Sequence, residues 1–324
     1  MRLSKTIKMM AASCLMVAGM ASSATAADME NIHFLVPGGA GGGWDGTARG
    51  VGEALTKSGL IKIASYENMS GGGGGKAISY LIETASKQKN TMMVNSTPIV
   101  IRSLQKIFPQ SFRDLTLIAA IIADYQVLVV RPDSPLKNWS DVLAKFKENP
   151  RKLKIGGGSS RGSMDHLVPA QIFKAAGQDP KAVRYVSFDA GGKAIAGLLT
   201  GEVDLLSTGF GEVFEKHKSG QIRIIAVTSA EPIKGAENIP TFKSEGVDMT
   251  FANWRGFFGA PGLEQETVDT MANILKKMYA TPEWEEVRAR NGWSDLYKPQ
   301  KEFEAFLIDQ ENTIGSLMKE LGFL

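Results

Sequence analysis

Three glycine-rich turns constrain this sequence more than any other feature. They lie at residues 36–50, 68–79 and 154–166, and each follows a strand-like apolar run and precedes a helix-like run. Glycine weakens the interior of helices and strands, so these clusters among the chain's 35 glycines indicate turns with a specific purpose. The repeated order of strand, glycine turn and helix predicts an α/β fold with parallel strands whose faces are covered.

The runs between the turns predict two successive series of strands and helices. In the first series we expect strands at 32–36, 60–68 and 91–96, with helices at 45–57, at 76–86 and from Pro98 onwards. In the second series we expect helices at 140–148, 163–176 and 193–199, with strands at 153–156, 183–188, 203–207 and 222–227. A return strand at 252–261 and three final helices complete the order, at 264–279, 282–291 and 299–321.

Residues 115–132 interrupt this alternation. They contain two apolar runs separated only by residues 123–125, a link too short for the helical crossover that joins parallel strands. We therefore expect the chain to pass from one lobe to another at this point. The predicted fold is α/β with two lobes, each a mostly parallel sheet flanked by helices. Residues 28–125 plus 252–324 are expected to form lobe 1, and residues 126–251 lobe 2.

Residues 1–27 are expected to be a secretory signal peptide. A basic start precedes the apolar run 9–20, which is too short to span a bilayer comfortably, and small residues at 24–27 fit a cleavage site. The single cysteine, Cys14, leaves a lipid anchor as a less favoured alternative, because apolar residues continue past it. After cleavage the chain contains no cysteine and therefore no disulfide.

The charge of the mature chain argues against nucleic acids and membrane surfaces as partners. Three of the 37 Lys and Arg residues lie in the signal peptide and none of the 34 Asp and Glu residues does, so the mature formal charge is zero. A general nucleic-acid binder needs a basic field, and no later stretch reaches the ~18 apolar residues of a transmembrane helix. We expect an exported protein that is not inserted in the membrane.

The placement of the glycine turns predicts a site for a small anion. In open α/β sheets, ligands bind at the carboxyl ends of strands, where turns lead into helix N-termini. The N–H groups exposed there attract anions together with the helix dipole, and glycine lets the backbone approach a ligand closely. We interpret the turns as backbone donors, from both lobes, that face one small anion.

Motifs for nucleotides, phosphates and metals are incomplete. Residues 41–46 match G-x-G-x-x-G, but Asp45 would face a pyrophosphate there. The second turn resembles a phosphate loop, but Ser70 replaces its first glycine and Ala77 its magnesium-binding Ser or Thr. Three scattered histidines and no mature cysteine give no metal-ligand spacing, so we expect neither a metal nor a cofactor.

A nucleophile motif is the most serious rival to a binding site. Residues 158–162 match G-x-S-x-G between a strand and a helix, with Ser160 in the nucleophile position. Asp204 and His217 follow in the order found in α/β-hydrolases. The alternative interpretation of this segment is a Ser/Gly turn that caps a helix, which we favour because Asp residues are numerous in the chain and His217 lies between lysines.

Five ordered segments resemble the periplasmic solute receptors of tripartite tricarboxylate transporters, also called Bug receptors. The similar segments are residues 34–55, 66–78, 128–167, 186–204 and 254–263. The resemblance covers nearly the whole mature chain. It implies a venus-flytrap fold, in which two lobes close on a carboxylated solute that is then delivered to membrane permease subunits.

The resemblance also implies which residues contact the ligand. In that family the first two turns hold one carboxylate through backbone N–H groups and ordered water, and the turns of the second lobe complete the pocket. Carried over by position, the candidate residues are Gly38, Gly39, Gly42, Gly43, Trp44, Asp45, Ser70, Gly72, Gly73, Gly74, Ser96, Thr97, Ser159, Ser160, Ser163, His166, Asp189 and Gly191.

Two departures from the family pattern bear on the ligand. Trp44 stands where the family usually has a threonine. The tryptophan makes this turn more similar to the subset of the family associated with citrate and other tricarboxylates. Ser187 and Phe188 replace a usual Pro-Tyr pair. Asp45, a carboxylate beside an anion site, is expected either to cap the following helix or to hold an ordered water or a ligand hydroxyl.

The sequence thus predicts a receptor without catalytic activity that binds a citrate-like di- or tricarboxylate. Two alternatives stay open at this point. One is an exported serine hydrolase with Ser160 as nucleophile, and the other is a carboxylate sensor that presents its closed form to a signalling partner.

Overall fold

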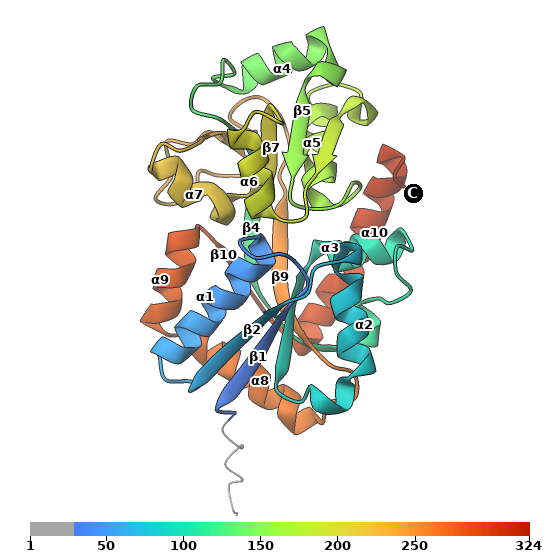
Figure 1. Cartoon of the computed structure of the whole chain (residues 1–324), viewed down its shortest axis with the longest axis vertical. Coiled ribbons are helices and arrows are strands. Elements are labelled where there is room, and N and C mark those ends of the chain that lie inside the picture. The colour runs from blue at the N-terminus through green and yellow to red at the C-terminus, as the bar shows by residue number, and fades with distance from the viewer. Residues whose placement is uncertain (1–28) are drawn as a thin grey trace, which may run out of the picture.

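The computed structural model describes residues 29–324, so the expected signal peptide lies outside the described residues. Strands and helices form two α/β lobes, one above the other in Figure 1. The strands of the lower lobe 1 are β1 (Asn31–Val36), β2 (Ile63–Asn68), β3 (Thr91–Ser96), β9 (Ala252–Gly259) and β10 (Ser294–Pro299). Those of the upper lobe 2 are β5 (Lys154–Gly157), β6 (Arg184–Ser187), β7 (Leu205–Gly209) and β8 (Arg223–Val227). The predicted two-lobed α/β fold is confirmed.

Helices cover both lobes. Around lobe 1 lie α1 (Gly43–Lys57), α2 (Gly75–Glu83), α3 (Thr97–Leu104), α8 (Gln265–Tyr279), α9 (Pro282–Asn291) and α10 (Gln300–Leu321). Around lobe 2 lie α4 (Trp139–Glu148), α5 (Met164–Ala175), α6 (Gly191–Leu199) and α7 (Phe210–Lys218). Short 3₁₀ turns occur at Gly72–Gly74, Ala85–Lys87, Phe112–Asp114, Pro150–Lys152 and Pro180–Ala182. Most predicted elements agree with these bounds to within a few residues.

Each lobe contains three parallel strands and antiparallel neighbours. In lobe 1, β1 pairs in parallel with β2 and β3, and β9 runs antiparallel beside β3. In lobe 2, β5 pairs in parallel with β6 and β7. The path through the joined sheet is β2-β1-β3-β9-β4-β7-β5-β6. The carboxyl ends of the parallel strands in the two lobes face each other, which places the glycine turns between the lobes.

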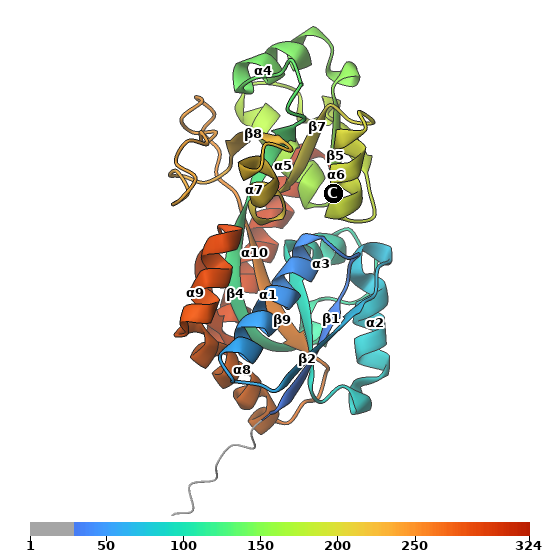
Figure 2. The same cartoon turned by 60° about the vertical axis from the view of Figure 1, so that its left-hand side comes forward.

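The long strand β4 (Thr116–Val130) joins the lobes and corrects one expectation. The expected link at residues 123–125 does not exist, because the strand is continuous through 15 residues (Figure 2). It pairs with β9 up to Tyr125 and with β7 from Gln126 onwards. Asp124, whose polarity suggested a break, is fully buried and bonded to Arg255. Polar residues do not interrupt a strand when a partner satisfies them.

Sequence patterns also missed α7 and β10. Helix α7 buries Phe210, Val213 and Phe214, which follow the i, i+3, i+4 spacing of an amphipathic helix. Strand β10 pairs with β4 through an irregular register. Its sequence therefore shows no clear alternation of apolar and polar residues. The omission of α7 matters because this helix contributes to the site between the lobes.

Alternate residues of the central strands pack on opposite faces of the sheet. Leu35 and Phe258 belong to the core under α2, α3 and α10, whereas Phe34 and Phe257 belong to the core under α1, α8 and α9. Both faces of the sheet are therefore covered, which explains why these strands are near-continuous apolar runs.

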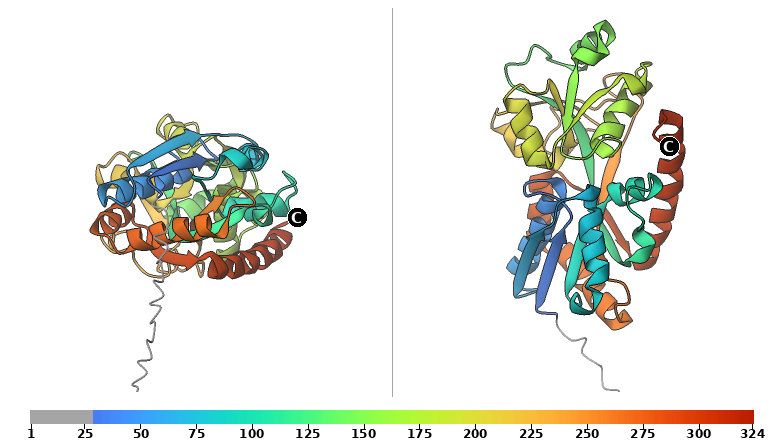
Figure 3. Two further views of the ribbon diagram at one scale, coloured as in Figure 1. Left: turned by 90° about the horizontal axis from the view of Figure 1, so that it is seen from below. Right: turned by 45° about the vertical axis from the view of Figure 1, so that its right-hand side comes forward.

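Helix α10 connects the two lobes on the outside. It lies along lobe 1, and its C-terminal end reaches lobe 2 (Figure 3). There the ring of Phe323 meets the ring of His166 edge to face, at a centroid distance of 5.0 Å. Leu321 shares a core cluster with Met164 and Leu167 of α5. This contact gives the arrangement of the lobes a second support besides β4.

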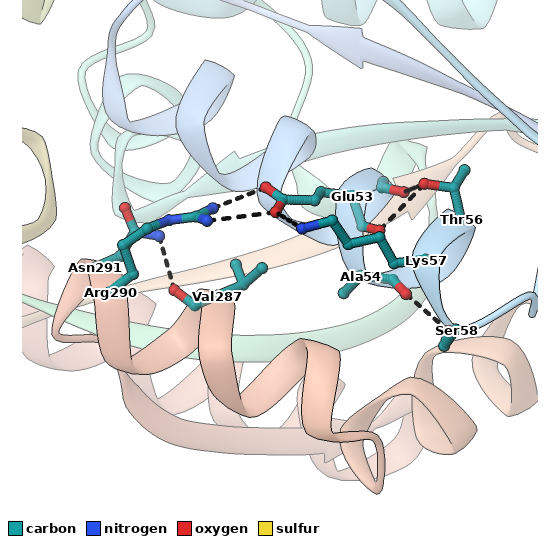
Figure 4. A network of polar contacts seen from close by, with 9 residues as sticks. Glu53, Ala54, Thr56, Lys57, Ser58, Val287, Arg290 and Asn291 are labelled. Atoms are coloured by element: carbon teal, nitrogen blue, oxygen red, sulfur yellow. Dashed lines mark hydrogen bonds and ion pairs between the residues drawn. The ribbon is translucent and has the colours of Figure 1, made fainter.

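Helix α1, which follows the first glycine turn, is held against α9 by an ion pair. Both Glu53 carboxylate oxygens accept hydrogen bonds from Arg290, at 3.3 and 2.7 Å, and Lys57 donates a further one at 2.8 Å (Figure 4). The bonds from Arg290 and Lys57 lower the pKa of Glu53 to about 2. The pair is partly exposed to solvent, so it orients α1 more than it stabilises the fold.

The packing of α1 on β2 predicts opposite effects for two glycines of the same helix. A Cβ at Gly52 would overlap the Tyr66 hydroxyl and lie 3.0 Å from Ala64 Cβ, whereas a Cβ at Gly46 meets nothing within 4 Å. Gly52→Ala should therefore destabilise the protein by about 1–3 kcal/mol through overpacking. Gly46→Ala should stabilise it by up to about 1 kcal/mol through helix propensity.

Chemical denaturation of both variants measures these changes in unfolding free energy. Equal changes in the two variants would contradict the packing of α1 described above.

Candidate functional site

A cavity of about 330 Å³ lies between the lobes, bordered by glycine turns from both of them. Its volume is at the lower end of the range of about 300–1,000 Å³ found for small-molecule sites. The structure brings fifteen of the eighteen candidate residues to its lining: Gly38, Gly39, Gly42, Gly43, Trp44, Ser70, Gly72, Gly73, Gly74, Ser96, Ser159, Ser160, Ser163, Asp189 and Gly191.

The other three candidates lie behind the lining. Asp45 accepts hydrogen bonds from Gly41 N at 2.9 Å, Arg49 Nε at 2.9 Å and Asn68 Nδ2 at 3.0 Å, so it ties the first turn to β2. Burial alone would raise the pKa of Asp45, but these hydrogen bonds outweigh it and lower that pKa. The expected capping of α1 by Asp45 is not found, because the N-cap residue is Gly42 and no side chain caps the helix. The Asp45 carboxylate instead holds the turn before the helix through Gly41 N.

Thr97 and His166 are placed behind the cavity by the elements that carry them. Thr97 follows the lining residue Ser96 and is only 1% exposed. His166 Nδ1 accepts a hydrogen bond from Gly162 N at 3.0 Å, and its ring stacks on Tyr185. Burial, with Arg161 nearby, lowers the pKa of His166 to about 4. The imidazole is therefore neutral and binds the backbone of the third turn through its hydrogen bond with Gly162 N.

Five helices begin at the cavity without a side-chain cap. The N-cap residues of α1, α2, α3, α5 and α6 all line the cavity, and none of their side chains accepts a hydrogen bond from its helix: Gly42, Gly74, Ser96, Ser163 and Ala190. Among the helices that begin elsewhere, α4 and α9 are capped by Asn138 and Thr281, whereas α7, α8 and α10 also lack a side-chain cap. The uncapped N-termini leave backbone N–H groups available for an anion.

The second turn has a backbone that only glycine adopts readily. Gly71, Gly72, Gly73 and Gly74 have φ values of 141°, 58°, 65° and 103°. L-residues rarely adopt such values, which explains the run of consecutive glycines in this turn. The path brings the start of α2 to the cavity next to Arg102, whose Nε would lie 3.0 Å from a Cβ at Gly73.

The two lobes touch across the cavity. Ser70 Oγ donates to Asp189 Oδ1 at 2.8 Å, and Arg102 donates to the carbonyl oxygens of Ser160 and Arg161 at 3.1 and 3.2 Å. The first turn also meets the fourth so closely that a Cβ at Gly39 would lie 2.9 Å from Ala190 Cβ. The structure therefore shows the lobes closed on each other.

Seven further polar residues outside the candidate set line the cavity: Arg102, Gln126, Asp165, Ser187, Glu212, Asn253 and Arg255. Three of them, together with Asp124, form a pattern that the sequence does contain. Asp124 and Gln126 alternate in β4, and Asn253 and Arg255 alternate in β9. A period of two places such residues on one face of a strand, so two polar pairs in apolar strands could have indicated a shared polar face.

Arg255 joins elements of both lobes at the edge of the cavity. Its Nη2 donates to Asp124 Oδ2 at 2.8 Å and lies 3.9 Å from Glu212 Oε1, and its Nη1 donates to Thr47 Oγ1 at 3.2 Å. Within residues 29–324, the Nε atoms of both Arg255 and Arg102 are buried and have no hydrogen-bond partner. Each of these two buried guanidinium groups, which belong to residues of the cavity lining, therefore has an Nε–H donor that is not used.

Two buried carboxyl groups complete the electrostatics of the site. Burial raises the pKa of Glu212 to about 8, opposed by Arg255 and reinforced by Asp165 and Asp124. Burial also raises the pKa of Asp165 to about 6, opposed by hydrogen bonds that include those of Ser159 and Gln126. At neutral pH Glu212 is therefore mainly protonated, which limits repulsion between the cavity and an anion.

The geometry does not support Ser160 as a nucleophile. Ser160 lines the cavity, but Asp204 accepts from Lys154 N at 2.8 Å and from Lys145 Nζ at 3.2 Å. His217 Nδ1 accepts from Ile224 N at 3.4 Å, and no hydrogen bond joins His217 to Asp204 among the described residues. In the described part of the chain, no hydrogen bond links Ser160 to either residue, and the relay that an α/β-hydrolase needs is not assembled.

Two further features, a membrane-spanning helix and a metal cluster, are absent from residues 29–324. No helix there is long and apolar enough to cross a membrane. No group of three or more His, Cys, Asp or Glu side chains there is arranged to hold a metal ion.

The raised pKa of Glu212 predicts a specific pH dependence of stability. The folded state binds the proton more tightly than the unfolded state, whose carboxyl titrates near 4.5, so stability falls as pH rises from about 4.5 to about 8. Glu212→Gln removes the pH-dependent contribution of Glu212 to stability. The pH-dependent contribution of Asp165 is present in both the variant and the parent protein. The stability of Glu212→Gln relative to the parent protein should therefore increase from pH 5 to pH 8, as measured by chemical denaturation.

Glu215→Gln, on the exposed side of α7, is the matched control and should follow the parent protein at every pH. A curve for Glu212→Gln that also runs parallel to the parent curve would show that Glu212 does not titrate in this range.

Comparisons with known proteins agree with this geometry. Residues 47–323 match the family described as "Tripartite tricarboxylate transporter family receptor". A UPF0065 protein from the tcbD-tcbE intergenic region of Pseudomonas sp. strain P51 is 25% identical over 256 residues, which cover 78% of this chain and 74% of the relative.

Solved structures of periplasmic binding proteins share the fold. The periplasmic binding protein BugD is similar with a TM-score of 0.81 and 21% identity, covering 90% of this chain and 97% of that one. Rpa4515 of R. palustris, solved with adipate, has a TM-score of 0.82 and 19% identity, with coverage of 90% and 97%. MatC of Rhodopseudomonas palustris, solved with bound malate, has a TM-score of 0.77 and 17% identity, with coverage of 89% and 98%. The chain belongs to the receptor family of tripartite tricarboxylate transporters.

Proposed function

We propose that the protein is an extracytoplasmic receptor that binds a small di- or tricarboxylate, of the citrate type, between its two lobes. The observation that carries the proposal is the convergence of five uncapped helix N-termini on one closed cavity. Backbone N–H groups and helix dipoles bind anions without a permanent cation. The unused Nε donor of Arg102 adds a charge-assisted hydrogen bond for a second carboxylate.

The family supports delivery of the ligand to the membrane permease subunits of a tripartite tricarboxylate transporter. Two proteins of the same fold, solved with malate and with adipate, support a carboxylate as the class of ligand. Periplasmic location after removal of residues 1–27 and a monomeric state are parts of the same proposal. A strain that lacks this receptor should lose uptake of the carboxylate that the purified protein binds.

The residue boundaries of the lobes are also a proposal. We place residues 28–125 plus 252–324 in lobe 1 and residues 126–251 in lobe 2. The exchange of partners within β4 supports this division, because Tyr125 pairs with Ala252 and Gln126 pairs with Gly209. The contacts of α10 with α5 show that the C-terminal end of lobe 1 also supports lobe 2.

A thermal-shift screen of the purified mature protein against carboxylic acids tests the proposal. A ligand present at about 100 times its dissociation constant should stabilise the fold by about 2.7 kcal/mol. Mass spectrometry of ligand that co-purifies with the protein identifies candidates for the screen. The absence of any stabilising carboxylate, from a panel that includes citrate, malate, succinate and adipate, would overturn the proposal.

Substitutions in the first turn test whether its backbone forms the site. Valine at Gly39 would collide with Ala190 and hold the lobes apart, and valine at Gly42 would lie against Gly39 O and Gly191 N. Gly39→Val and Gly42→Val should therefore weaken carboxylate binding about tenfold or more, or about 1.4 kcal/mol, measured by calorimetry.

The matched control for these variants is Gly46→Ala, which changes a glycine outside the cavity and should keep the parent affinity. Parent affinity in both valine variants would mean that the glycine turn takes no part in binding.

Chemical labelling separates binding from hydrolysis. If Ser160 only lines a binding cavity, a fluorophosphonate probe should leave it unlabelled. Ser160→Ala should then weaken binding by no more than about 1–3 kcal/mol, the scale of a hydrogen bond to a charged group. Labelling of Ser160, together with loss of an ester-hydrolysing activity in Ser160→Ala, would favour the hydrolase instead.

A further inference from the structure

The two sides of the cavity differ in their hydrogen-bonding character. Towards the glycine turns, the cavity presents N–H donors from the helix N-termini and from Arg102. Towards the strands that join the lobes, it is lined by amide and carboxyl side chains. These come from Gln126, Asp165, Glu212 and Asn253, which we call the acceptor floor.

The β4–β9 pair builds the centre of the acceptor floor. Asn253 of β9 lies directly opposite Asp124 of β4 in the antiparallel register. Residues that face each other across such a pair, and residues two apart along a strand, share one face of the sheet. Gln126, Asn253 and Arg255 therefore stand on the same side as Asp124 and line the cavity from the junction of the lobes.

The amide oxygens of the floor are buried without a partner. Gln126 and Asn253 are 2% and 7% exposed, and within the described residues neither Gln126 Oε1 nor Asn253 Oδ1 accepts a hydrogen bond. The orientation of the Gln126 amide is fixed by its Nε2, which donates to Asp165 Oδ1 at 3.4 Å. Buried polar atoms in native proteins almost always have a partner, so these oxygens indicate a donor that a ligand brings.

Donors accompany the acceptors of the floor: the amide nitrogens of Gln126 and Asn253, and the guanidinium group of Arg255. The Nη2 of Arg255 is bonded to Asp124, but its Nε has no partner among the described residues. A ligand group that fits here must donate to an amide or carboxyl oxygen and also accept from a guanidinium N–H. A hydroxyl group does both, whereas an ammonium group only donates and a carboxylate only accepts.

We propose that the acceptor floor is a subsite for a hydroxyl group on the carbon skeleton of the ligand, so that the receptor selects hydroxycarboxylates over the same acids without the hydroxyl. This inference rests on the proposed function, because the carboxylates of the same ligand occupy the helix N-termini. It assigns Gln126, Asn253 and Glu212 as specificity-determining residues.

Matched acids test the subsite. Calorimetry compares citrate with tricarballylate, and both enantiomers of malate with succinate, since each pair differs only by a hydroxyl group. In at least one pair the hydroxylated acid should bind about tenfold tighter or more. The acid without the hydroxyl group leaves the buried acceptors unpaired. Equal or weaker binding of the hydroxylated acid in every pair that binds would overturn the subsite while leaving carboxylate binding intact.

Two further outcomes are distinguishable. Aspartate that binds more tightly than malate would show that the floor takes an ammonium group and would overturn the hydroxyl assignment. If none of these acids binds, the proposed function fails, and the subsite fails with it.

Gln126→Met removes one acceptor at nearly constant volume and should reduce the preference for the hydroxylated acid to about threefold or less, with a smaller effect on the unsubstituted acid. Gln221→Met makes the same substitution at an exposed position of lobe 2 and should leave the preference unchanged. Asn253→Leu provides the same test if Gln126→Met does not fold. An unchanged preference in folded Gln126→Met or Asn253→Leu would contradict the subsite.

Discussion

The buried ion pair between Arg255 and Asp124 is the interaction on which the rest of the structure depends. The two side chains are 3% and 0% exposed and join β9 to β4 where β4 leaves lobe 1. The same guanidinium contacts Thr47 at the start of α1 and lies beside Glu212 of α7. Loss of one partner in such a pair typically costs about 3–5 kcal/mol, because the other charge is left buried and uncompensated.

The position of this pair bears on how a chain with a formal net charge of only +3 provides the proposed anion site. Asp124 compensates the charge of Arg255, and the hydrogen bonds of Arg102 to lobe 2 hold the lobes together. In the proposed function, binding of a carboxylate relies mainly on backbone N–H groups at helix N-termini, which are fixed by the fold and need no countercharge. The raised pKa of Glu212, to about 8, keeps this carboxyl group mainly neutral beside the ligand.

Local patterns in the sequence were sufficient to predict the lobes, the glycine turns and the helix starts that border the cavity. Each of these features is encoded within about one strand, turn and helix, as Gly71–74 illustrate with their positive φ values. The acceptor floor was missed because it depends on pairing between distant segments. Asp124 suggested a break in β4, since nothing local shows that Arg255, 131 residues later, would satisfy it. Glu212 was missed with α7, the helix that carries it.

The central claim is that the uncapped N-termini of helices from both lobes hold a carboxylate in the closed cavity. A crystal structure of the mature protein with the tightest-binding acid from the screen tests this claim most directly. The account predicts a carboxylate oxygen within about 3.2 Å of backbone nitrogens at the starts of α1 and α2, with atoms of lobe 2 in contact with the same ligand. A ligand bound outside the cavity, or held there by side chains alone without these backbone N–H groups, would contradict it.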